Sequence, residues 1–211
     1  MRKFFLAFIL IILSHSAYSQ DVIDSGISKT YYQTGELQGE INYLEGKHHG
    51  DTKIYYENGS LMIEGTFVDG KSDGITRTYY ENGNVQAEIN QKDGKFEGIT
   101  NLFYENGDIQ EEISYKDNKI DGVVKSYYEG GIKKSEINFK EGMHDGISKT
   151  YSGDGILTEE MNYVEGKIEG IVKFYDESSR LAKEEDYVDN KLINVREYAE
   201  DGVFVSRDAK N

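Results

Sequence analysis

The sequence is dominated by a unit of 24 residues that repeats without insertion or deletion. Its opening glycine recurs seven times, at Gly26, Gly50, Gly74, Gly98, Gly122, Gly146 and Gly170. A fixed period of this length indicates a repeat architecture, in which each unit is one supersecondary element that stacks on its neighbours. The chain of 211 residues is therefore predicted to form one elongated array, although its length alone suggests one or two globular domains.

Apolar and polar residues alternate within each unit, which we number from 0 at its opening glycine. In the third unit, positions +1, +5, +11 and +15 hold Ile75, Tyr79, Val85 and Ile89, whereas +2, +4, +14 and +16 are polar. An alternation with period two predicts strands, and no helical period competes with it. We expect an all-β fold: an elongated antiparallel β-meander of seven hairpin repeats in a single curled sheet, with the apolar columns on the inside.

Two glycine-containing columns separate the strands. The first contains Asn82–Gly83 in the third unit, and the second contains Asp93–Gly94. In the second column only Asn118 and Asn190 replace glycine, which indicates a backbone with positive φ. A two-residue turn at Asn-Gly would send the apolar columns of the two strands to opposite faces, whereas a three-residue turn unites them. We therefore predict three-residue turns at both columns, with +5 paired to +11 and +1 paired to +15.

The first nineteen residues have the composition of a secretory signal peptide. Arg2 and Lys3 form a basic start, and Phe4–Leu13 is an apolar run that is too short to span a bilayer. Ala17 and Ser19 have the spacing of a cleavage site. We expect export to a periplasm or to the outside of the cell; the alternative interpretation of this segment is an N-terminal core strand.

The expected organisation is a signal peptide (1–19), a lead-in (20–25), seven repeats (26–193) and a degenerate eighth repeat with a C-terminal cap (194–211). No cysteine is present, so no disulfide can form. The formal net charge is −15, and loss of the two basic residues of the signal peptide makes it −17. So acidic a chain is repelled by nucleic acid and anionic membranes and suits a basic protein partner. No segment after the signal peptide is apolar enough to be an integral membrane span.

The unit pattern G-x-x-x-x-Y-Y-x-N-G, followed by a Glu, an aromatic residue and D-G-K-x-x-G, resembles the bacterial variant of the MORN repeat. The resemblance extends from Gly26 to about Arg207, in seven copies that keep one register. It implies an elongated antiparallel β array used for protein association and scaffolding, with links to membranes in some members. Bacterial proteins of this kind are grouped with a YwqK-type, antitoxin-like family, which implies a neighbouring toxin as the partner.

Two regular columns form the candidate binding surface. Position +6 holds Tyr32, Tyr56, Tyr80, Tyr104 and Tyr128, and position +14 holds a Glu in every unit, with Glu64, Glu88, Glu112 and Glu136 in the candidate surface. We expect both columns on one polar face, with each Glu opposite position +2. The tyrosines fit either a self-supporting cross-strand stack or an exposed recognition surface. The Glu column fits bonds to backbone N–H groups, pairs with basic residues of column +3 such as Arg77, or a ladder that binds a cation or a basic ligand.

No constellation of residues predicts an enzyme. Catalysis by two carboxylates needs two different environments, and copies of one Glu related by translation share one environment. A letter match to a Walker loop occurs at Gly65–Ser72 and one to G-x-S-x-G at Gly70–Gly74, but both motifs need a strand that leads into a helix, and a strand is expected here. The histidines of the second turn column, His48, His49 and His144, are expected to be solvated. We therefore predict no catalytic residue, no metal site and no cofactor.

Three functions fit these features. The first is an exported, non-enzymatic repeat protein that acts as a protein-binding or scaffolding surface. The second is an antitoxin-like or immunity partner that neutralises a toxin or effector. The third is a carbohydrate- or cell-wall-binding surface built from the tyrosine columns. The sequence leaves the oligomeric state open.

Overall fold

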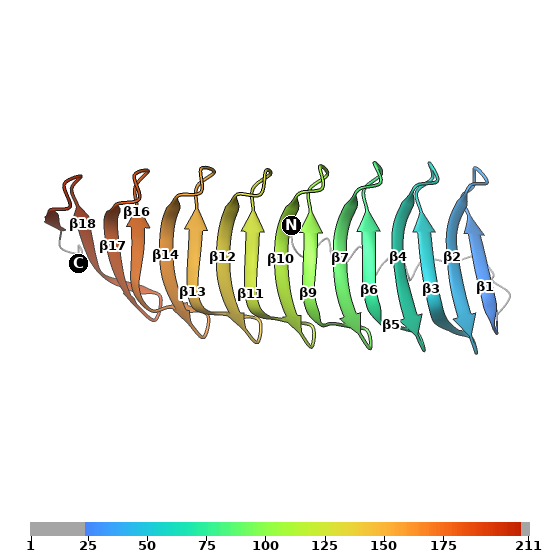
Figure 1. Ribbon diagram of the computed structural model, residues 1–211. Helices are drawn as coiled ribbons and strands as arrows, with labels where there is room; N and C mark the ends of the chain where they lie inside the picture. The colour runs from blue at the N-terminus through green and yellow to red at the C-terminus, as the bar shows by residue number, and fades with distance from the viewer. Residues whose placement is uncertain (1–23, 208–211) are drawn as a thin grey trace.

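The protein is described by a computed structural model that covers residues 24–207. The predicted signal peptide (1–19), residues 20–23 of the predicted lead-in and residues 208–211 lie outside the described residues. The strands stand side by side in one row, from β1 at the N-terminal end to the C-terminal strands (Figure 1), and each pairs in antiparallel fashion with its neighbours in the chain. The predicted fold, an all-β array of 24-residue hairpins in a single open sheet, is confirmed.

The sheet contains nineteen strands. Three of them, β5, β8 and β15, have two residues each and continue directly into the next strand after one residue. The strands are β1 (Gly26–Tyr31), β2 (Leu37–Leu44), β3 (Lys47–Tyr55), β4 (Leu61–Val68), β5 (Lys71–Ser72), β6 (Gly74–Tyr79), β7 (Val85–Lys92), β8 (Lys95–Phe96), β9 (Gly98–Phe103), β10 (Ile109–Lys116), β11 (Lys119–Tyr127), β12 (Lys133–Lys140), β13 (Met143–Tyr151), β14 (Leu157–Val164), β15 (Lys167–Ile168), β16 (Gly170–Tyr175), β17 (Leu181–Val188), β18 (Lys191–Tyr198) and β19 (Phe204–Arg207).

The first turn of each unit has three residues, as predicted. In the third unit the backbone N–H of Tyr80 donates to the carbonyl of Asn84, and the N–H of Gly83 donates to the carbonyl of Tyr80, both at 2.9 Å. Gly83 has a φ of 88°, which explains the glycine. The Oδ1 of Asn82 accepts the N–H of Asn84 at 2.9 Å, which is the local hydrogen bond that favours Asn in turns.

The second turn has only two residues, so the prediction of three is wrong there. Lys92 pairs with Lys95, and the two residues between them, Asp93 and Gly94, have φ values of 50° and 78°. Two successive residues with positive φ form a type I′ turn, whose twist matches that of the flanking strands. The acidic residue of this column adopts positive φ in all seven units. The sequence reveals this requirement only at the glycine column, because Asp and Glu also serve as ordinary loop residues.

A one-residue bulge in each unit changes the register after the first turn. Tyr79 pairs with Val85, as predicted, but Thr78 pairs with Ala87, so that Gln86 at position +12 is an extra residue. Beyond this bulge every pairing shifts by one: +1 faces +16 and +2 faces +15. The predicted pairing of +1 with +15 is therefore wrong. A shift of one residue exchanges the two faces of a strand.

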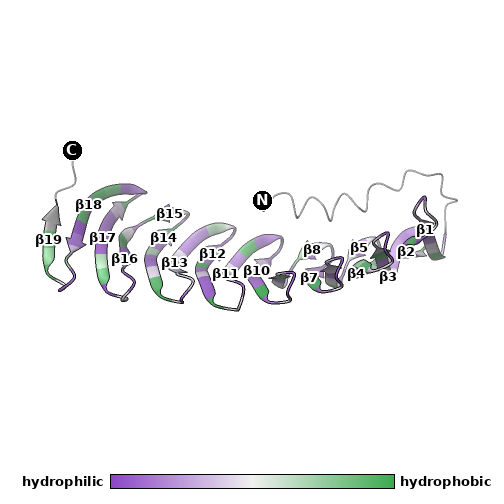
Figure 2. Cartoon of the chain, turned by 90° about the horizontal axis from the view of Figure 1, so that it is seen from above, coloured by the Kyte–Doolittle hydropathy of each residue, from purple (hydrophilic) through white to green (hydrophobic). Residues whose placement is uncertain are grey.

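The bulge decides which columns are buried. We call the face formed by columns +2, +4, +13, +15 and +17 the inner face and the face formed by +1, +3, +5, +14 and +16 the outer face. On the inner face Thr76, Ala87 and Ile89 are at most 7% exposed, whereas Ile75 on the outer face is 43% exposed. The prediction that columns +1 and +5 belong to the buried side is wrong, while Ile89 at +15 is buried as predicted. Figure 2 shows that the hairpins are curved when seen along the strands.

The opening glycine of each unit lies where the strand bends. All seven opening glycines have positive φ, between 86° and 129°. At Gly122 the backbone φ is 109°, and a Cβ atom would come within 3.0 Å of Ser114. Next to this glycine three residues of β11 lie opposite one residue of β10, which marks an irregular, bent ladder. The most regular column of the sequence is therefore explained by backbone conformation.

The densest packing lies on the inner face at the centre of the array. Ile113, Val124 and Phe139 form its buried cluster, and Leu102, Tyr115, Ile120 and Ile137 pack against them. The cluster draws on β9 to β12, which belong to two consecutive units, so each unit completes its core with a neighbour.

Two histidines that we predicted to be solvated lie between aromatic rings of the inner face. His48 lies between Tyr43 and Phe67, with ring centroids 4.8 and 5.5 Å apart. His144 has the equivalent place between Phe139 and Tyr163. Burial lowers the pKa of His48. The prediction of solvated turn histidines is thus wrong for these two, because position +22 shares the inner face with the aromatic column +17.

The C-terminal units keep the hairpin pattern but depart from its details. Ser179 takes the place of the first turn glycine and has a φ of 61°, a conformation that is strained for a residue with a Cβ atom. Strands β18 and β19 form an eighth hairpin, and Phe204 in its last strand is 53% exposed. The pairing therefore continues into the segment that we predicted to be a degenerate repeat.

Candidate functional site

The Glu column lies on the outer face, directly opposite the basic column +3. Glu88 pairs with Arg77 in the ladder, and the Arg77 Nε donates to its carboxylate at 2.8 Å. The expectation that each Glu faces +2 is wrong, because the bulge moves the register by one. The alternative that the Glu residues pair with basic residues of column +3 is correct for most units, although the pairs cross directly between strands. Glu136 and Glu184 instead form their ion pairs with Lys133 and Arg196.

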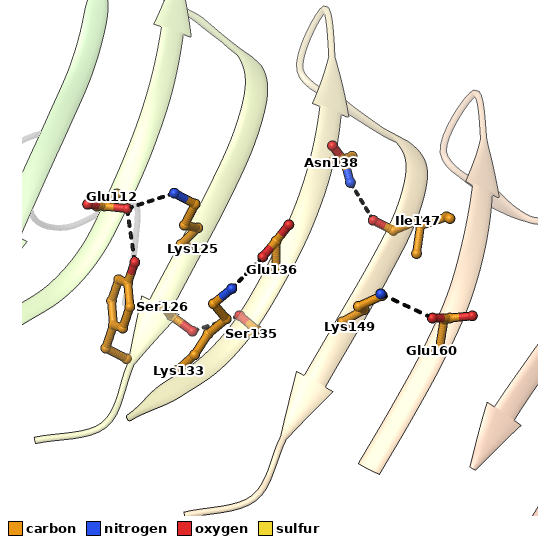
Figure 3. Close-up of polar contacts among 11 residues, drawn as sticks. Glu112, Lys125, Ser126, Lys133, Ser135, Glu136, Asn138, Ile147, Lys149 and Glu160 are labelled. Carbon is orange, nitrogen blue, oxygen red and sulfur yellow. Dashed lines mark hydrogen bonds and ion pairs between the residues drawn. The ribbon is translucent and has the colours of Figure 1, made fainter. Parts of the chain in front are cut away.

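The pairs join into one ladder of alternating charge. Each basic residue lies between the Glu of its own unit and the Glu of the preceding unit: Lys125 pairs with both Glu112 and Glu136 in the strand register. Figure 3 shows the Glu112–Lys125 contact, with 3.3 Å between Nζ and the carboxylate, and the Lys149–Glu160 contact at 3.4 Å. The fourth unit interrupts the ladder, because Asn101 holds position +3 there.

The Glu carboxylates also accept hydrogen bonds from the tyrosines of column +5. The Tyr79 hydroxyl donates to Glu64 at 2.6 Å, and Tyr127 donates to Glu112 at 3.0 Å. Burial, followed by this hydrogen bond to Glu64, raises the pKa of Tyr79 to about 12. The Glu column is therefore engaged in internal contacts on the outer face.

The tyrosines of column +6 have a different environment. Each of their hydroxyls donates to the carbonyl of position +5 in the following unit, at 2.7 to 3.0 Å: Tyr32 to Tyr55, Tyr56 to Tyr79, Tyr80 to Phe103, Tyr104 to Tyr127 and Tyr128 to Tyr151. The rings are half-buried. The structure does not bring the two predicted columns together, because the Glu residues contact column +5, the residue just before.

A hollow of about 500 Å³ opens beside these tyrosines, near the first turns of units three to five. Two of the predicted residues, Tyr80 and Tyr104, line it, and none of the predicted Glu residues does. Its other side chains include residues of the bulge column and of positions +4 and +13, namely Gln86, Gln110, Lys134, Leu102, Ser126 and Glu111. Sequence reasoning missed the bulge column, because residues as different as Gln86 and Lys134 fill it.

An acidic rim borders the hollow. Position +7, next to the tyrosine column, holds Glu57, Glu81, Glu105 and Glu129, all of them exposed. Burial, together with the nearby Glu105, raises the pKa of Tyr80, and Glu57 and Glu81 act in the same way on Tyr32 and Tyr56. In units two to five the rim repeats once per unit, at the same spacing as the tyrosines. It was not part of the predicted surface; Glu fills its column in five of the seven units, whereas Glu fills column +14 in all seven.

One carboxyl of the inner face has a raised pKa. Burial, followed by the charge of Glu185, raises the pKa of Glu159, while Lys183 acts in the opposite direction. Lys183 lies 2.8 Å from Glu185 and 3.9 Å from the centre of the Phe174 ring. This group is a polar cluster at the C-terminal end of the inner face, and Glu159 and Glu185 are its two carboxyls; Glu185 accepts hydrogen bonds from Lys183 and Tyr187, both at 2.8 Å.

Residues 24–207 contain no group of three or more His, Cys, Asp or Glu side chains that could hold a metal ion. Over the same residues there is no helix of the length and apolar character needed to cross a membrane.

Comparison with known families gives one match. The sequence pattern of the family described as MORN repeat variant matches residues 25–45, 49–69, 72–93, 96–117, 120–141 and 145–165. These segments fall in six consecutive units and cover more than half of the chain. A search of curated proteins gives no match.

Proposed function

Because this chain belongs to the MORN repeat variant family, we propose that it is an exported, non-enzymatic protein that binds a protein partner along its inner face. MORN repeats are in general modules that bind proteins or membranes. The charges and hydroxyls of the outer face are engaged in the ladder. One hollow of that face, about 290 Å³, is lined by ladder residues such as Glu64 and Arg77, and another of about 620 Å³ lies near Tyr187 at the C-terminal end. The hollow of the inner face instead combines aromatic rings with amide groups.

The hollow of units three to five is the observation that carries this proposal. It joins half-buried aromatic rings to amide groups, a hydroxyl and a lysine, in about 500 Å³ of space. Aromatic side chains with a polar handle are enriched at protein interfaces, because they bury a large area at a small entropic cost. Tyr80 and Tyr104 are already held by hydrogen bonds of 2.8 Å to the backbone, so a partner would meet a preorganised surface.

The outer face supports a scaffolding role in the same proposal. Its ladder of alternating charges crosses from strand to strand and ties neighbouring units together. Each exposed pair contributes only about 0.5 kcal/mol, but the pairs share partners along the array. A surface held in this way keeps the spacing between binding positions constant.

A site-specific crosslinking experiment tests the proposal. A photo-reactive amino acid is placed at Gln110, which lines the hollow, and in a second protein at Ile99, which is 53% exposed on the outer face. We expect one and the same protein to be crosslinked from position 110 and not from position 99, in envelope or culture fractions. Crosslinking from position 99 alone, or none from either position, would contradict the proposal. Export is tested in parallel by comparing the location of the full chain with that of a chain that lacks residues 1–19.

The acidic rim favours a second candidate, the antitoxin-like function implied by the family resemblance. A chain with a formal net charge of −15 and one Glu per unit beside the hollow suits a basic toxin. Co-expression with the product of each adjacent gene tests this candidate. Rescue of growth from one such product supports it, and the absence of any growth effect contradicts it. Binding of purified cell-wall glycan to the chain, lost when Tyr80 and Tyr104 are replaced by Ala, would instead support the carbohydrate-binding alternative.

A further inference from the structure

We propose that the partner segment in the hollow is a proline-rich, basic stretch in the polyproline II conformation, lying along the array and across the strands. This inference rests on the proposed function and specifies the partner of the same site. Four observations carry it: the spacing of the units, the hydrogen bonds that hold the tyrosine rings in place, the polar side chains of the hollow and the acidic rim.

The spacing of the units matches the pitch of a polyproline II helix. Each unit adds two strands to the sheet, and neighbouring strands lie about 4.8 Å apart, so equivalent positions recur about every 9.6 Å. A polyproline II helix has three residues per turn and a rise of about 3.1 Å, which gives a pitch of about 9.3 Å. The same side of such a ligand therefore returns at each successive unit.

Other ligand conformations do not repeat in step with the units. An extended strand also covers one unit with about three residues, but its side chains alternate with period two, so successive units would meet opposite sides of it. An α-helix advances about 1.5 Å per residue, so one unit corresponds to about 6.4 residues, which is not a whole number of its turns. Only the threefold ligand presents one constant face to a surface with this repeat.

The tyrosine rings of the hollow are held in positions where such a ligand can pack against them. Polyproline II segments dock on grooves lined by aromatic rings. The hydroxyls of Tyr80 and Tyr104 donate hydrogen bonds to the carbonyls of Phe103 and Tyr127, and these bonds hold the rings in place. Each ring then offers a fixed apolar surface, one per unit, against which a proline ring can pack.

The hollow also supplies hydrogen-bond donors at the same spacing. Gln86 and Gln110 occupy the bulge position of consecutive units, and both line the hollow. The amide oxygen of Gln86 accepts from the Thr78 hydroxyl at 3.3 Å, so the donor that it offers is its NH2 group. Proline has no N–H group, and the backbone carbonyls of a polyproline II helix have no internal hydrogen bond. Side-chain amides that donate to carbonyls are therefore the polar groups that fit this ligand.

The negative charges of the acidic rim indicate a basic residue at the third position of the ligand's three-residue repeat. Glu81, Glu105 and Glu129 lie on the rim of the units that form the hollow, one per unit. A ligand with one basic residue in every three would place a positive charge next to each of them. Lys134 bounds the hollow in unit five, with its Nζ 5.4 Å from the centre of the Tyr128 ring. Because Lys134 is positively charged, the basic residues of the ligand are expected to face the acidic rim and to lie away from this lysine.

Binding of a peptide of four Pro-Pro-Lys units, measured by fluorescence anisotropy on the full mature chain, tests the inference. A peptide of the same composition with all lysines gathered at one end has the same charge without the period. We expect the periodic peptide to bind at least about tenfold more tightly, a difference of about 1.4 kcal/mol. Equal affinity of the two peptides would overturn the inference, because charge alone would then explain the binding. Binding of neither peptide would overturn it as well.

Adjacent tyrosines provide a matched pair of variants. Tyr80→Ala removes a ring of the hollow, whereas Tyr79→Ala removes the neighbouring ring on the outer face. We expect a loss of about tenfold in affinity from the first and a change within about twofold from the second. Glu105→Lys alters only an exposed rim residue and is expected to weaken binding several-fold, which keeps the test decisive if Tyr80→Ala does not fold. Equal effects at positions 79 and 80, or no effect of Glu105→Lys, would contradict the inference.

The crosslinking at Gln110 separates this inference from the function on which it rests. Capture of a partner at position 110, combined with no preference for the periodic peptide, removes the polyproline II ligand and leaves the binding function. Failure of both experiments removes both.

Discussion

The two faces of this single sheet are built from the same strands but differ in nearly every property. Ile75 and Thr76 are neighbours in β6, and yet the isoleucine is 43% exposed while the threonine is 7% exposed. Val123 and Val124 differ in the same way, since Val124 is 1% exposed and Val123 remains partly exposed. The comparison teaches that register, and not the hydrophobicity of each residue, decides burial in this array.

The two faces are also stabilised by different interactions. The inner face packs side chains from successive units and holds histidines between aromatic rings, whereas on the outer face each Glu pairs with a basic residue and several also accept a tyrosine hydroxyl. A single-layer sheet has no second layer to bury its outer face, so polar pairing is what remains available there. The predictions below test this division from the largest expected effect to the smallest.

The largest effect is expected at the two adjacent valines. Val124→Ala removes two buried methyl groups from the central cluster and should cost about 2 kcal/mol of unfolding free energy. Val123→Ala has the same chemistry and the same change in strand propensity, and it should cost less than about 0.5 kcal/mol. Denaturant unfolding of both variants is the measurement. Equal losses at the two positions would mean that the faces are not distinct.

The buried hydroxyls of column +2 should respond in the opposite sense. The hydroxyl of Thr100 is buried and has no hydrogen-bond partner, and Val124 and Val172 fill the same column in other units. Thr100→Val is therefore expected to stabilise the protein by about 1 kcal/mol. On the outer face, Thr66→Val removes a hydroxyl that donates to Asp51 at 3.0 Å, and it should give no stabilisation. Thermal unfolding of the two variants distinguishes these outcomes.

A large part of this fold can be predicted from the sequence alone. Strand identity, the 24-residue unit and the three-residue first turn all follow from its columns, whereas the pairing of Glu with column +3 was one of three alternatives that the columns left open. The bulge at Gln86 could not be foreseen, because residues of any type fill the position, and both registers produce alternating strands. The hydrophobic pattern then predicted that Ile at +1 is buried and Thr at +2 is exposed, which is wrong. Strand propensity does not correct this error, because both residues are β-branched and fit a strand equally well. The hollow depends on that bulge, so it was missed with it.

A smaller effect is expected where the outer ladder is interrupted. Asn101 lies opposite Glu88 on one side and Glu112 on the other. Asn101→Lys should complete the alternation of charges and stabilise the protein by about 0.5 kcal/mol at low salt, with the gain decreasing as the salt concentration rises. Urea unfolding at two salt concentrations measures it. A gain that does not depend on salt would point to a cause other than the ladder.

The smallest effect concerns the pH dependence of stability that arises from His48. Burial lowers the pKa of His48 in the folded state below its ordinary value of 6.5, so the unfolded chain binds the proton more readily. The contribution of His48 is therefore complete above about pH 6.5 and is lost as the pH falls through the lower pKa of the folded state. We expect a loss on the order of a few tenths of a kcal/mol between neutral and mildly acidic pH. His48→Phe should remove this dependence in melting curves recorded across that range.

Cysteine labelling at positions 75 and 76 tests the division of the faces most directly. The chain contains no cysteine, so Ile75→Cys and Thr76→Cys each introduce a single reactive group. The register with a bulge in every unit predicts rapid modification of position 75 by a thiol reagent and strong protection of position 76 under native conditions, with equal rates after unfolding. Protection at position 75 and rapid reaction at position 76 would show the register without the bulge and would contradict the account.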